Sequence, residues 1–147
     1  MKQTRRKAIT SFLLLFSILL LSLTACSGDA IKIEDYEWKM RTVMKNDSDL
    51  IVPAVGEADE VYPDAKVVDL TLTAKDGKIT ITDSTNNTTY EGTYTVEGKN
   101  PKGTDYKVVI DSKEGYATAA MTKYDDGNEE PTLPINLGDY SIYFYAD

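Results

Sequence analysis

The amino-acid sequence predicts an all-β protein, an antiparallel meander of about eight strands that closes into a small barrel. Three observations lead to this prediction. Apolar and polar residues alternate with a period of two along most of the chain after residue 36, which is the pattern of half-buried strands. Turn-forming residues separate the alternating runs. A meander of this length closes into a barrel because closure leaves no unpaired strand edge.

The first 25 residues have the pattern of an export signal. Four cationic residues lie within the first seven positions, and residues 9–23 contain no charged side chain. This combination is typical of a signal peptide, which is removed from the mature protein. The uncharged stretch approaches the roughly 20 residues that span a bilayer, so a retained transmembrane anchor is the alternative.

The end of this stretch, Leu23-Thr24-Ala25-Cys26, resembles the lipobox of bacterial lipoproteins. The resemblance implies that the leader, residues 1–25, is removed and that the Cys26 thiol carries a diacylglyceryl group. Two acyl chains hold a protein stably on a bilayer, so the chain would be anchored to the extracytoplasmic face of the cell membrane. A chance cysteine after an ordinary signal peptide is the alternative. We expect residues 26–35 to form a lipidated tether and residues 36–147 to form the barrel domain.

Composition excludes several kinds of function. The chain contains no histidine and one cysteine, which removes histidine-dependent catalysis, the usual zinc ligand and any intramolecular disulfide. Its net charge is −8, and removal of the leader would leave 12 cationic against 24 acidic residues, a net charge of −12. Such a chain lacks the basic face that nucleic acid requires. We therefore expect neither an enzyme nor a nucleic-acid-binding protein.

The N-terminal part of the barrel domain shows the weaker pattern. Residues 31–36 predict a short turn that closes one end of the barrel. Residues 37–44 predict a strand with Trp38, Met40 and Met44 on one face. Helix is the alternative for this second segment because it contains good helix formers.

The middle of the chain contains the clearest hairpin. Residues 50–55 predict a short edge strand, because Pro53 cannot donate a ladder hydrogen bond. Residues 68–74 and 79–82 alternate between apolar and polar side chains and flank Asp76-Gly77. This dipeptide favours the type I′ turn of a two-residue hairpin.

Four further alternating segments predict strands at residues 89–97, 106–111, 116–124 and 140–146. The Gly- and Lys-rich segment 98–103 predicts a loop without ladder hydrogen bonds. The acidic run 125–130 predicts a solvated hairpin loop ended by Pro131 and Pro134. A calcium-binding loop is the alternative, since oxygen ligands at short spacing around a glycine suit calcium.

An early strand that contains a tryptophan, Glu37-Trp38-Lys39-Met40, is followed by short hairpins rich in Thr, Gly and Tyr. Over residues 35–147 this arrangement resembles the lipocalin-like barrels of many small bacterial lipoproteins. A barrel of about eight strands has an interior that is either filled by side chains or able to hold one small ligand.

Large residues on the predicted inward faces are the candidates for lining a pocket. These candidates are Trp38, Met40, Leu70, Leu72, Tyr94, Tyr106 and Phe144. Small inward residues such as Gly92 and Ala117 leave room beside them. A completely filled core is the alternative, because protein interiors pack tightly.

The carboxylates Asp69, Glu91 and Asp111 are predicted to lie on outer faces, where no facing catalytic pair can form. The sequence therefore predicts a non-catalytic binding module for a small apolar or amphipathic ligand, without metal or cofactor. The alternative is a protein–protein interaction or structural module of the cell envelope. Tyr143 and Tyr145 are the predicted exposed surface for that alternative.

Overall fold

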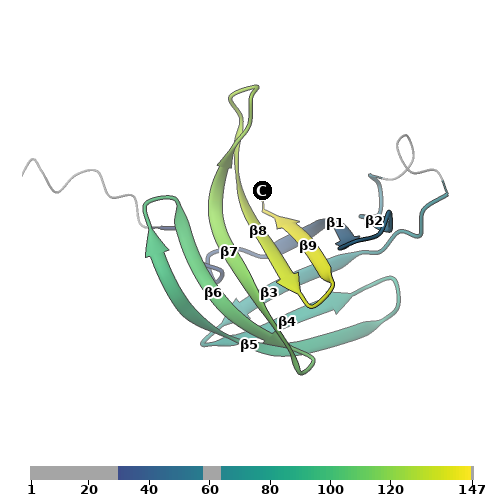
Figure 1. Cartoon of the computed structure of the whole chain (residues 1–147), viewed down its shortest axis with the longest axis horizontal. Helices are drawn as coiled ribbons and strands as arrows, with labels where there is room; N and C mark the ends of the chain where they lie inside the picture. The colour runs from purple at the N-terminus through teal and green to yellow at the C-terminus, as the bar shows by residue number, and fades with distance from the viewer. Residues whose placement is uncertain (1–29, 58–63, 147) are drawn as a thin grey trace, which may run out of the picture.

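The protein is an all-β fold in the computed structural model, which describes residues 30–57 and 64–146. Nine strands lie within these residues (Figure 1). They are β1 (Trp38–Lys45), β2 (Ile51–Pro53), β3 (Leu70–Lys75), β4 (Lys78–Asp83), β5 (Thr88–Asn100), β6 (Gly103–Ile110), β7 (Lys113–Lys123), β8 (Glu129–Leu137) and β9 (Tyr140–Tyr145).

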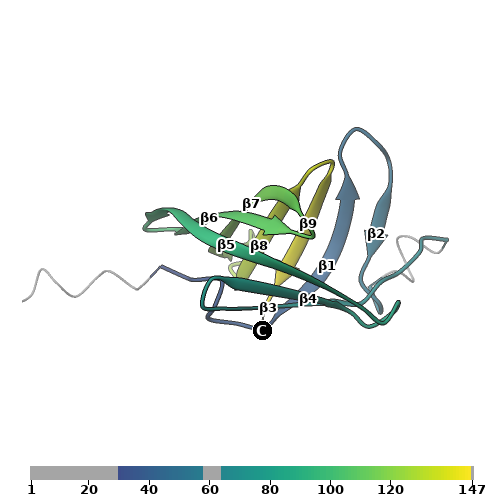
Figure 2. The ribbon, with the colours of Figure 1, turned by 90° about the horizontal axis from the view of Figure 1, so that it is seen from below.

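Eight of these strands form a closed antiparallel barrel. Strands β1 and β3 to β9 pair in chain order, and β9 pairs back onto β1. The short strand β2 pairs with the second half of β1, beyond the place where β1 leaves β3. Figure 2 shows the strands curving around one interior. This architecture confirms the predicted meander and is consistent with a lipocalin-like barrel.

The β3–β4 hairpin forms where the sequence predicts it. Lys75 pairs with Lys78 across Asp76 and Gly77, whose φ angles are +50° and +79°. A type I′ turn needs positive φ at both central residues, and Asp followed by Gly adopts this geometry at low cost.

A bulge in β1 changes which of its side chains face the interior. The pairing of β1 with β9 shifts register between Met40 and Thr42, so Val43 continues the inward face that Trp38 and Met40 begin. Met44 instead lies on the outer side and is 39% exposed. The predicted shared face is therefore wrong for Met44, because a bulge adds one residue and reverses the alternation beyond it.

The sequence does not predict strand β8, because its first residues are expected in a loop ended by Pro131 and Pro134. Pro131 and Pro134 lie inside this strand, and Pro134 pairs with Tyr143 of β9. On its other side, the β7–β8 ladder is interrupted at Leu133 and Pro134 and resumes in the same register. The prediction that the prolines end a loop is wrong, because the missing N–H of Pro134 falls where that ladder is open.

The prediction that residues 98–103 hold no ladder is also wrong. Strands β5 and β6 stay paired through this segment, with a register shift between Val96 and Gly98. Gly103 approaches β7 so closely that a Cβ atom there would lie 2.3 Å from the Ala119 carbonyl oxygen. Glycine at this position therefore permits close strand packing instead of ending the sheet.

The segment before β1 closes one end of the barrel, as the sequence predicts. Ile33 is fully buried; its N–H donates to the Tyr106 hydroxyl at 3.1 Å, and its carbonyl accepts from the Trp38 indole N–H at 2.8 Å. The Tyr36 ring packs edge-to-face against Trp38, with 5.3 Å between ring centroids. The packed fold thus includes Ile33, which lies within residues 26–35, the segment predicted to form the tether.

The predicted signal peptide, residues 1–25, and the predicted lipid-attachment residue Cys26 lie outside the described residues. Both stay predictions. Within the described ranges, no helix has the length and apolar character needed to cross a membrane.

Candidate functional site

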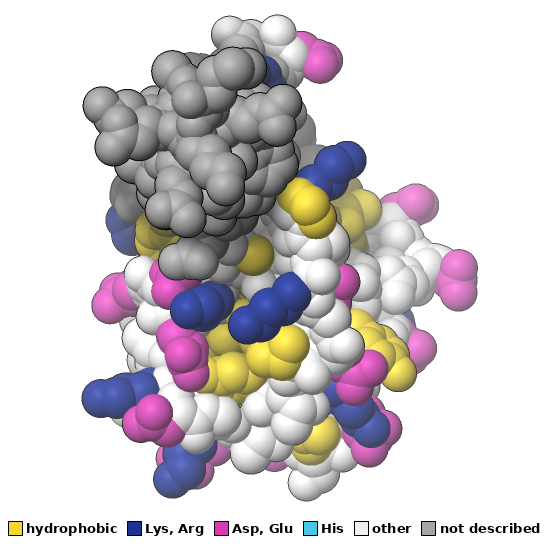
Figure 3. Space-filling view, turned by 90° about the vertical axis from the view of Figure 1, so that its left-hand side faces the viewer, with side chains coloured by type: hydrophobic (Ala, Val, Ile, Leu, Met, Phe, Trp, Pro, Cys, Tyr) yellow, Lys and Arg dark blue, Asp and Glu magenta, His cyan; other side chains and the backbone are white. Residues whose placement is uncertain are grey.

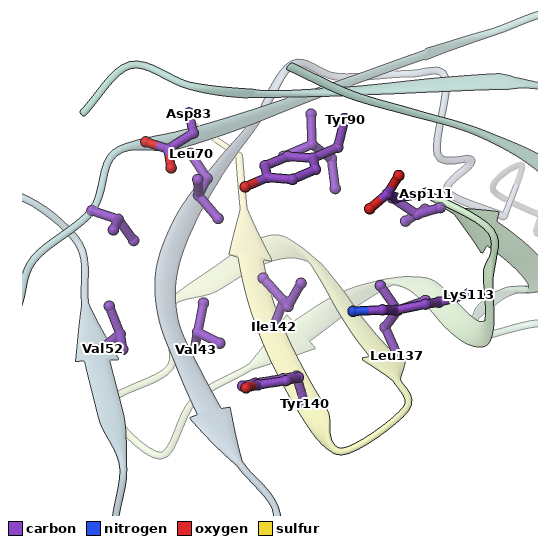
Figure 4. A pocket seen from close by; sticks show the side chains of 13 residues that line it. Val43, Val52, Leu70, Asp83, Tyr90, Asp111, Lys113, Leu137, Tyr140 and Ile142 are labelled. Carbon is purple, nitrogen blue, oxygen red and sulfur yellow. The ribbon is translucent and has the colours of Figure 1, made fainter. Parts of the chain in front are cut away.

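A cavity of about 280 Å³ opens at the end of the barrel opposite the closing segment 31–36. All nine strands, or the turns beside them, contribute to its lining, and Figure 4 shows these side chains from close by. The lining residues are Val43, Val52, Val68, Leu70, Ile81, Asp83, Tyr90, Ile110, Asp111, Lys113, Leu137, Tyr140 and Ile142.

The floor and walls of this cavity are apolar. Ile81 and Ile110 are buried members of the core and lie at its base. Val43 and Ile142 are cross-strand partners in β1 and β9 and form one wall. These side chains point into the cavity because they continue the inward-facing alternation of their strands.

The arrangement of β1, β2 and β3 makes room for the cavity. Strand β1 pairs with β3 at Trp38 and Lys39. From Thr42 onward, the same edge of β1 pairs with β2. The wall then continues through a parallel bridge between Ala54 and Val68. Because a barrel widens as strands are added, the extra strand enlarges the opening relative to the closed end.

Polar groups lie at the rim of the cavity. Tyr90 and Tyr140 are 37% and 39% exposed and occupy opposite sides of the opening in Figure 4. Asp111 and Lys113 come from the β6–β7 turn and the start of β7. Within the described part of the chain, no ion pair joins either of these two charged groups to a partner. The rim therefore offers charged groups and phenol hydroxyls above an apolar interior.

The turn that carries these charges has a constrained backbone. Asp111 and Ser112 have φ angles of +48° and +64°, a region that non-glycine residues adopt at some cost and that Asp tolerates better than most. The pairing of Ile110 with Lys113 leaves two residues for this turn. Asp111 therefore lies at the cavity rim, and its predicted position on an outer strand face is wrong.

Asp83 is the buried carboxylate of the cavity lining. It is 4% exposed, and its oxygens accept hydrogen bonds from the backbone N–H and the side-chain amide of Asn86 at 3.0 and 2.7 Å. Burial alone would raise the pKa of Asp83, but the hydrogen bonds from Asn86 and from the Thr85 backbone N–H outweigh burial and lower the pKa below its ordinary value. The carboxylate thereby stabilises the β4–β5 turn beside the opening.

Of the seven residues predicted to line a pocket, one lines the cavity and six are buried in the packed core. Leu70 lines the cavity. The other six belong to the packed core: Trp38, Met40, Leu72, Tyr94, Tyr106 and Phe144. Phe144 also borders a groove on the outer surface. The half of the barrel near the closed end is filled by these large side chains, which is the alternative that tight packing predicts.

Sequence reasoning missed most of the lining residues. Ile81, Ile110 and Ile142 lie on faces that the alternation predicts as inward, so their orientation was available from the sequence. Their place at the open end was not, because alternation gives the face and not the depth of a residue. The bulge in β1 reverses the alternation before Val43, so the sequence pattern does not predict an inward face for this residue. Val52 lies in β2, the strand whose apolar–polar alternation is weakest.

Two tyrosine hydroxyls at the closed end form hydrogen bonds within the fold. The Tyr94 hydroxyl donates to the Glu34 carboxylate, which also accepts from the Asp76 backbone N–H at 3.2 Å. Burial, followed by the hydrogen bond to Glu34, raises the pKa of Tyr94 to about 12. Burial also raises the pKa of Tyr106, whose hydroxyl accepts from the buried Ile33 N–H.

A charged cluster lies on the outer surface at the bulge of β1. The Arg41 guanidinium donates to both carboxylate oxygens of Glu130 at 2.7 and 3.2 Å, and the Tyr124 hydroxyl donates to the same carboxylate. These contacts, the hydrogen bond to Glu130 first, raise the pKa of Arg41 above its ordinary value. The guanidinium also lies 4.5 Å from the centroid of the Tyr145 ring, so Tyr145 is partly covered, whereas Tyr143 is 40% exposed.

Carboxylates of the acidic run 125–130 are engaged in local contacts. Asp126 accepts from the backbone N–H and the side-chain amide of Asn128 at 2.9 and 2.8 Å. Glu129 forms an ion pair with Lys123 at 3.2 Å. Among the residues that the structure describes, no three His, Cys, Asp or Glu side chains are grouped so that they could hold a metal ion.

Comparisons of the chain with protein-family models, with curated proteins and with solved structures found no match. The functional interpretation therefore depends on the geometry of the barrel and on the residues at its open end.

Proposed function

We propose that this chain is a membrane-anchored extracytoplasmic lipoprotein whose barrel binds a small apolar or amphipathic ligand at its open end. The observation that carries the proposal is an open apolar cavity in a barrel whose opposite end is sealed. Small-molecule sites usually have this form, a concave apolar surface with a few polar groups placed at defined positions.

The cavity favours a compact ligand. Its volume of about 280 Å³ lies near the lower end of the range for ligand pockets, roughly 300 to 1,000 Å³. The apolar floor suits a hydrocarbon body, and the rim groups of Tyr90, Asp111 and Lys113 suit one polar group at its outer end. An amphipathic molecule of about the size of a substituted naphthalene meets both requirements.

We propose that the barrel has no catalytic role. We also propose that Cys26 carries the lipid anchor. The absence of histidine from the sequence supports the first statement, as does the use of the buried Asp83 carboxylate in a turn. The lipobox resemblance supports the second. Incorporation of labelled palmitate by the wild-type chain, with loss of the label in Cys26→Ala, tests the anchor.

Titration of the soluble part, residues 27–147, with the fluorescent probe anilinonaphthalenesulfonate tests the cavity. Val43→Phe adds a ring inside the cavity, and the matched control Met44→Phe adds the same ring on the outer face of the same strand. We expect Val43→Phe to weaken probe binding by about tenfold or more, because an occupied cavity cannot accept the probe. Probe binding that is equally weak, or equally strong, in both variants would contradict the proposal.

A second candidate function, protein–protein interaction in the cell envelope, is supported by a groove of about 430 Å³ on the outer surface. Met44, Pro134 and Tyr143 contribute to its lining, and two of these side chains are substantially exposed. Under this alternative, Tyr143→Lys abolishes cross-linking to an envelope protein and leaves probe binding unchanged. Under the cavity proposal, Val43→Phe is the variant that loses function.

A further inference from the structure

We infer that the ligand at the open end of the barrel is a compact zwitterionic amphiphile, whose polar end carries one anionic and one cationic group that meet Lys113 and Asp111. This inference rests on the proposed cavity site and names the chemistry of the ligand's polar end. Its basis is that two residues of opposite charge line the same apolar cavity and form no ion pair with each other.

The alternation of β7 directs Lys113 toward the barrel interior. Gly115, Ala117 and Ala119 are buried on the inward face of this strand. Lys113 lies two residues before Gly115, so its side chain leaves the strand on the same side. In Figure 4 the Lys113 side chain extends over the cavity that it lines. The strand backbone therefore places this cation at the mouth of an apolar cavity.

The same hairpin holds Asp111. Its backbone N–H donates to the Glu91 carbonyl oxygen of β5 at 3.0 Å, and Ile110 pairs with Lys113 across the turn. The φ angle of Asp111, +48°, matches the positive value that a two-residue hairpin turn requires. In Figure 4 its carboxylate turns toward the cavity. The backbone that carries both charges is therefore hydrogen-bonded within the fold, so a ligand does not have to order it.

Charged groups on the outer surface are arranged differently. Glu114, the residue after Lys113, lies on the outer face of β7 and pairs with Lys107 at 3.1 Å. Figure 3 shows basic and acidic side chains next to one another on one face of the molecule. Neighbouring opposite charges weaken each other's field. Asp111 and Lys113, in contrast, have no ion-pair partner among the residues that the structure describes.

Asp83, the third charged residue of the cavity lining, already has hydrogen-bond partners. Its carboxylate accepts from the backbone N–H and the side-chain amide of Asn86 at 3.0 and 2.7 Å. In Figure 4 it lies beside Leu70, on the side of the cavity away from Lys113. The lining therefore leaves one cation and one anion for a ligand to pair with.

A polar end with both signs of charge fits this pair better than an ion of one sign. Lys113 attracts an anion and Asp111 repels it, and a cation meets the reverse, so the two Coulomb energies largely cancel. A zwitterion whose anionic group lies toward Lys113 gains both attractions. These attractions are stronger over an apolar cavity than in bulk water, because the effective dielectric constant is lower there. The rings of Tyr90 and Tyr140 border the same opening and suit an ammonium group.

Four amphiphiles with the same octyl tail test this inference: octyl sulfobetaine, octanesulfonate, octyltrimethylammonium and octyl glucoside. The sulfobetaine is zwitterionic, the next two carry one charge each, and the glucoside is neutral. Each amphiphile is titrated below its micelle-forming concentration into the soluble part, residues 27–147, which contains every strand of the barrel. Calorimetry measures the dissociation constants.

We expect the wild-type barrel to bind octyl sulfobetaine about fivefold or more tightly than each of the other three, because each partly exposed charge contact contributes about threefold. Lys113→Gln should remove the advantage over octyltrimethylammonium. Asp111→Asn should remove the advantage over octanesulfonate, and asparagine keeps the turn because it also adopts positive φ. The matched control Glu114→Gln, on the outer face of the same strand, should leave all four affinities unchanged.

The outcomes separate the inference from the proposed function. Equal affinities of all four amphiphiles in the wild-type barrel, each weakened by Val43→Phe, would overturn the zwitterionic ligand and leave the cavity site standing. Tightest binding of octanesulfonate or of octyltrimethylammonium would overturn it in favour of a ligand with one charge. Failure of all four to bind would overturn the cavity site and the inference together.

Discussion

The two ends of the barrel are built from the same strands and differ in what fills them. At the closed end, Trp38, Tyr106 and the buried Ile33 occupy the interior, and their polar atoms hydrogen-bond to one another. At the open end, the inward residues are smaller, such as Val43 and Ile142, and no equivalent segment among the described residues covers them. Barrel topology therefore does not by itself produce a pocket, because side-chain size and a capping segment decide whether an end is solid.

Truncating a large side chain is predicted to lower the free energy of unfolding more at the closed end than at the open end. Trp38→Ala should lower the free energy of unfolding by about 3 to 5 kcal/mol, because it removes a fully buried ring and leaves a void in the packed half. Tyr90→Ala, at the rim, should cost about 1 kcal/mol or less because its ring is 37% exposed. Urea denaturation of both variants measures the difference. Similar losses would show that the two ends are packed alike.

Asp83 is predicted to contribute stability at the open end that depends on pH. Asp83→Ala removes the acceptor for two hydrogen bonds from Asn86 and should cost about 1 to 3 kcal/mol at neutral pH. The pKa of Asp83 is lower in the folded than in the unfolded chain, so its contribution is present above the ordinary value of about 4 and is lost as the pH falls through the folded value.

Urea midpoints of wild type and Asp83→Ala at pH 7 and below about pH 3 measure this dependence. The exposed Asp69→Ala is the control, and we expect no change of midpoint for it beyond the usual surface effect. A difference between wild type and Asp83→Ala that grows on acidification would have the opposite sign and would refute the assignment.

A smaller effect is predicted for single hydroxyl groups. Tyr106→Phe removes the oxygen that accepts from the buried Ile33 N–H and should cost about 1 kcal/mol, together with faster amide exchange of Ile33. Tyr140→Phe, at the rim, should leave stability unchanged within about 0.5 kcal/mol. Unchanged exchange of Ile33 in Tyr106→Phe would indicate that the closing segment is held without this bond.

Much of the fold was available from the sequence, because most strands alternate cleanly and Asp76-Gly77 marks its hairpin. The errors arise where backbone pairing overrides local preference. Pro134 lies in a strand because a gap in one ladder accommodates it, and Met44 faces outward because a bulge precedes it. Neither feature is visible in composition or in alternation.

The candidate site was less accessible to sequence reasoning than the fold. Alternation predicts an inward face for Ile79 and Ile81 alike, yet Ile79 fills the core and Ile81 also borders the cavity. The difference depends on how far each residue lies from the capping segment, which is a property of the closed barrel. The sequence predicts large residues such as Trp38 to line a pocket, whereas in the structure the large residues fill the barrel interior.

Methyl NMR of the soluble part during titration with anilinonaphthalenesulfonate tests most directly whether the open end is the binding site. The account predicts saturable shifts of the methyl groups of Val43, Ile81 and Ile142, which line the cavity. The methyl resonances of Leu133 and Val108, which are fully buried in the core, should not shift. Shifts confined to the outer groove around Met44, or an absence of saturable shifts, would contradict a ligand site at the open end.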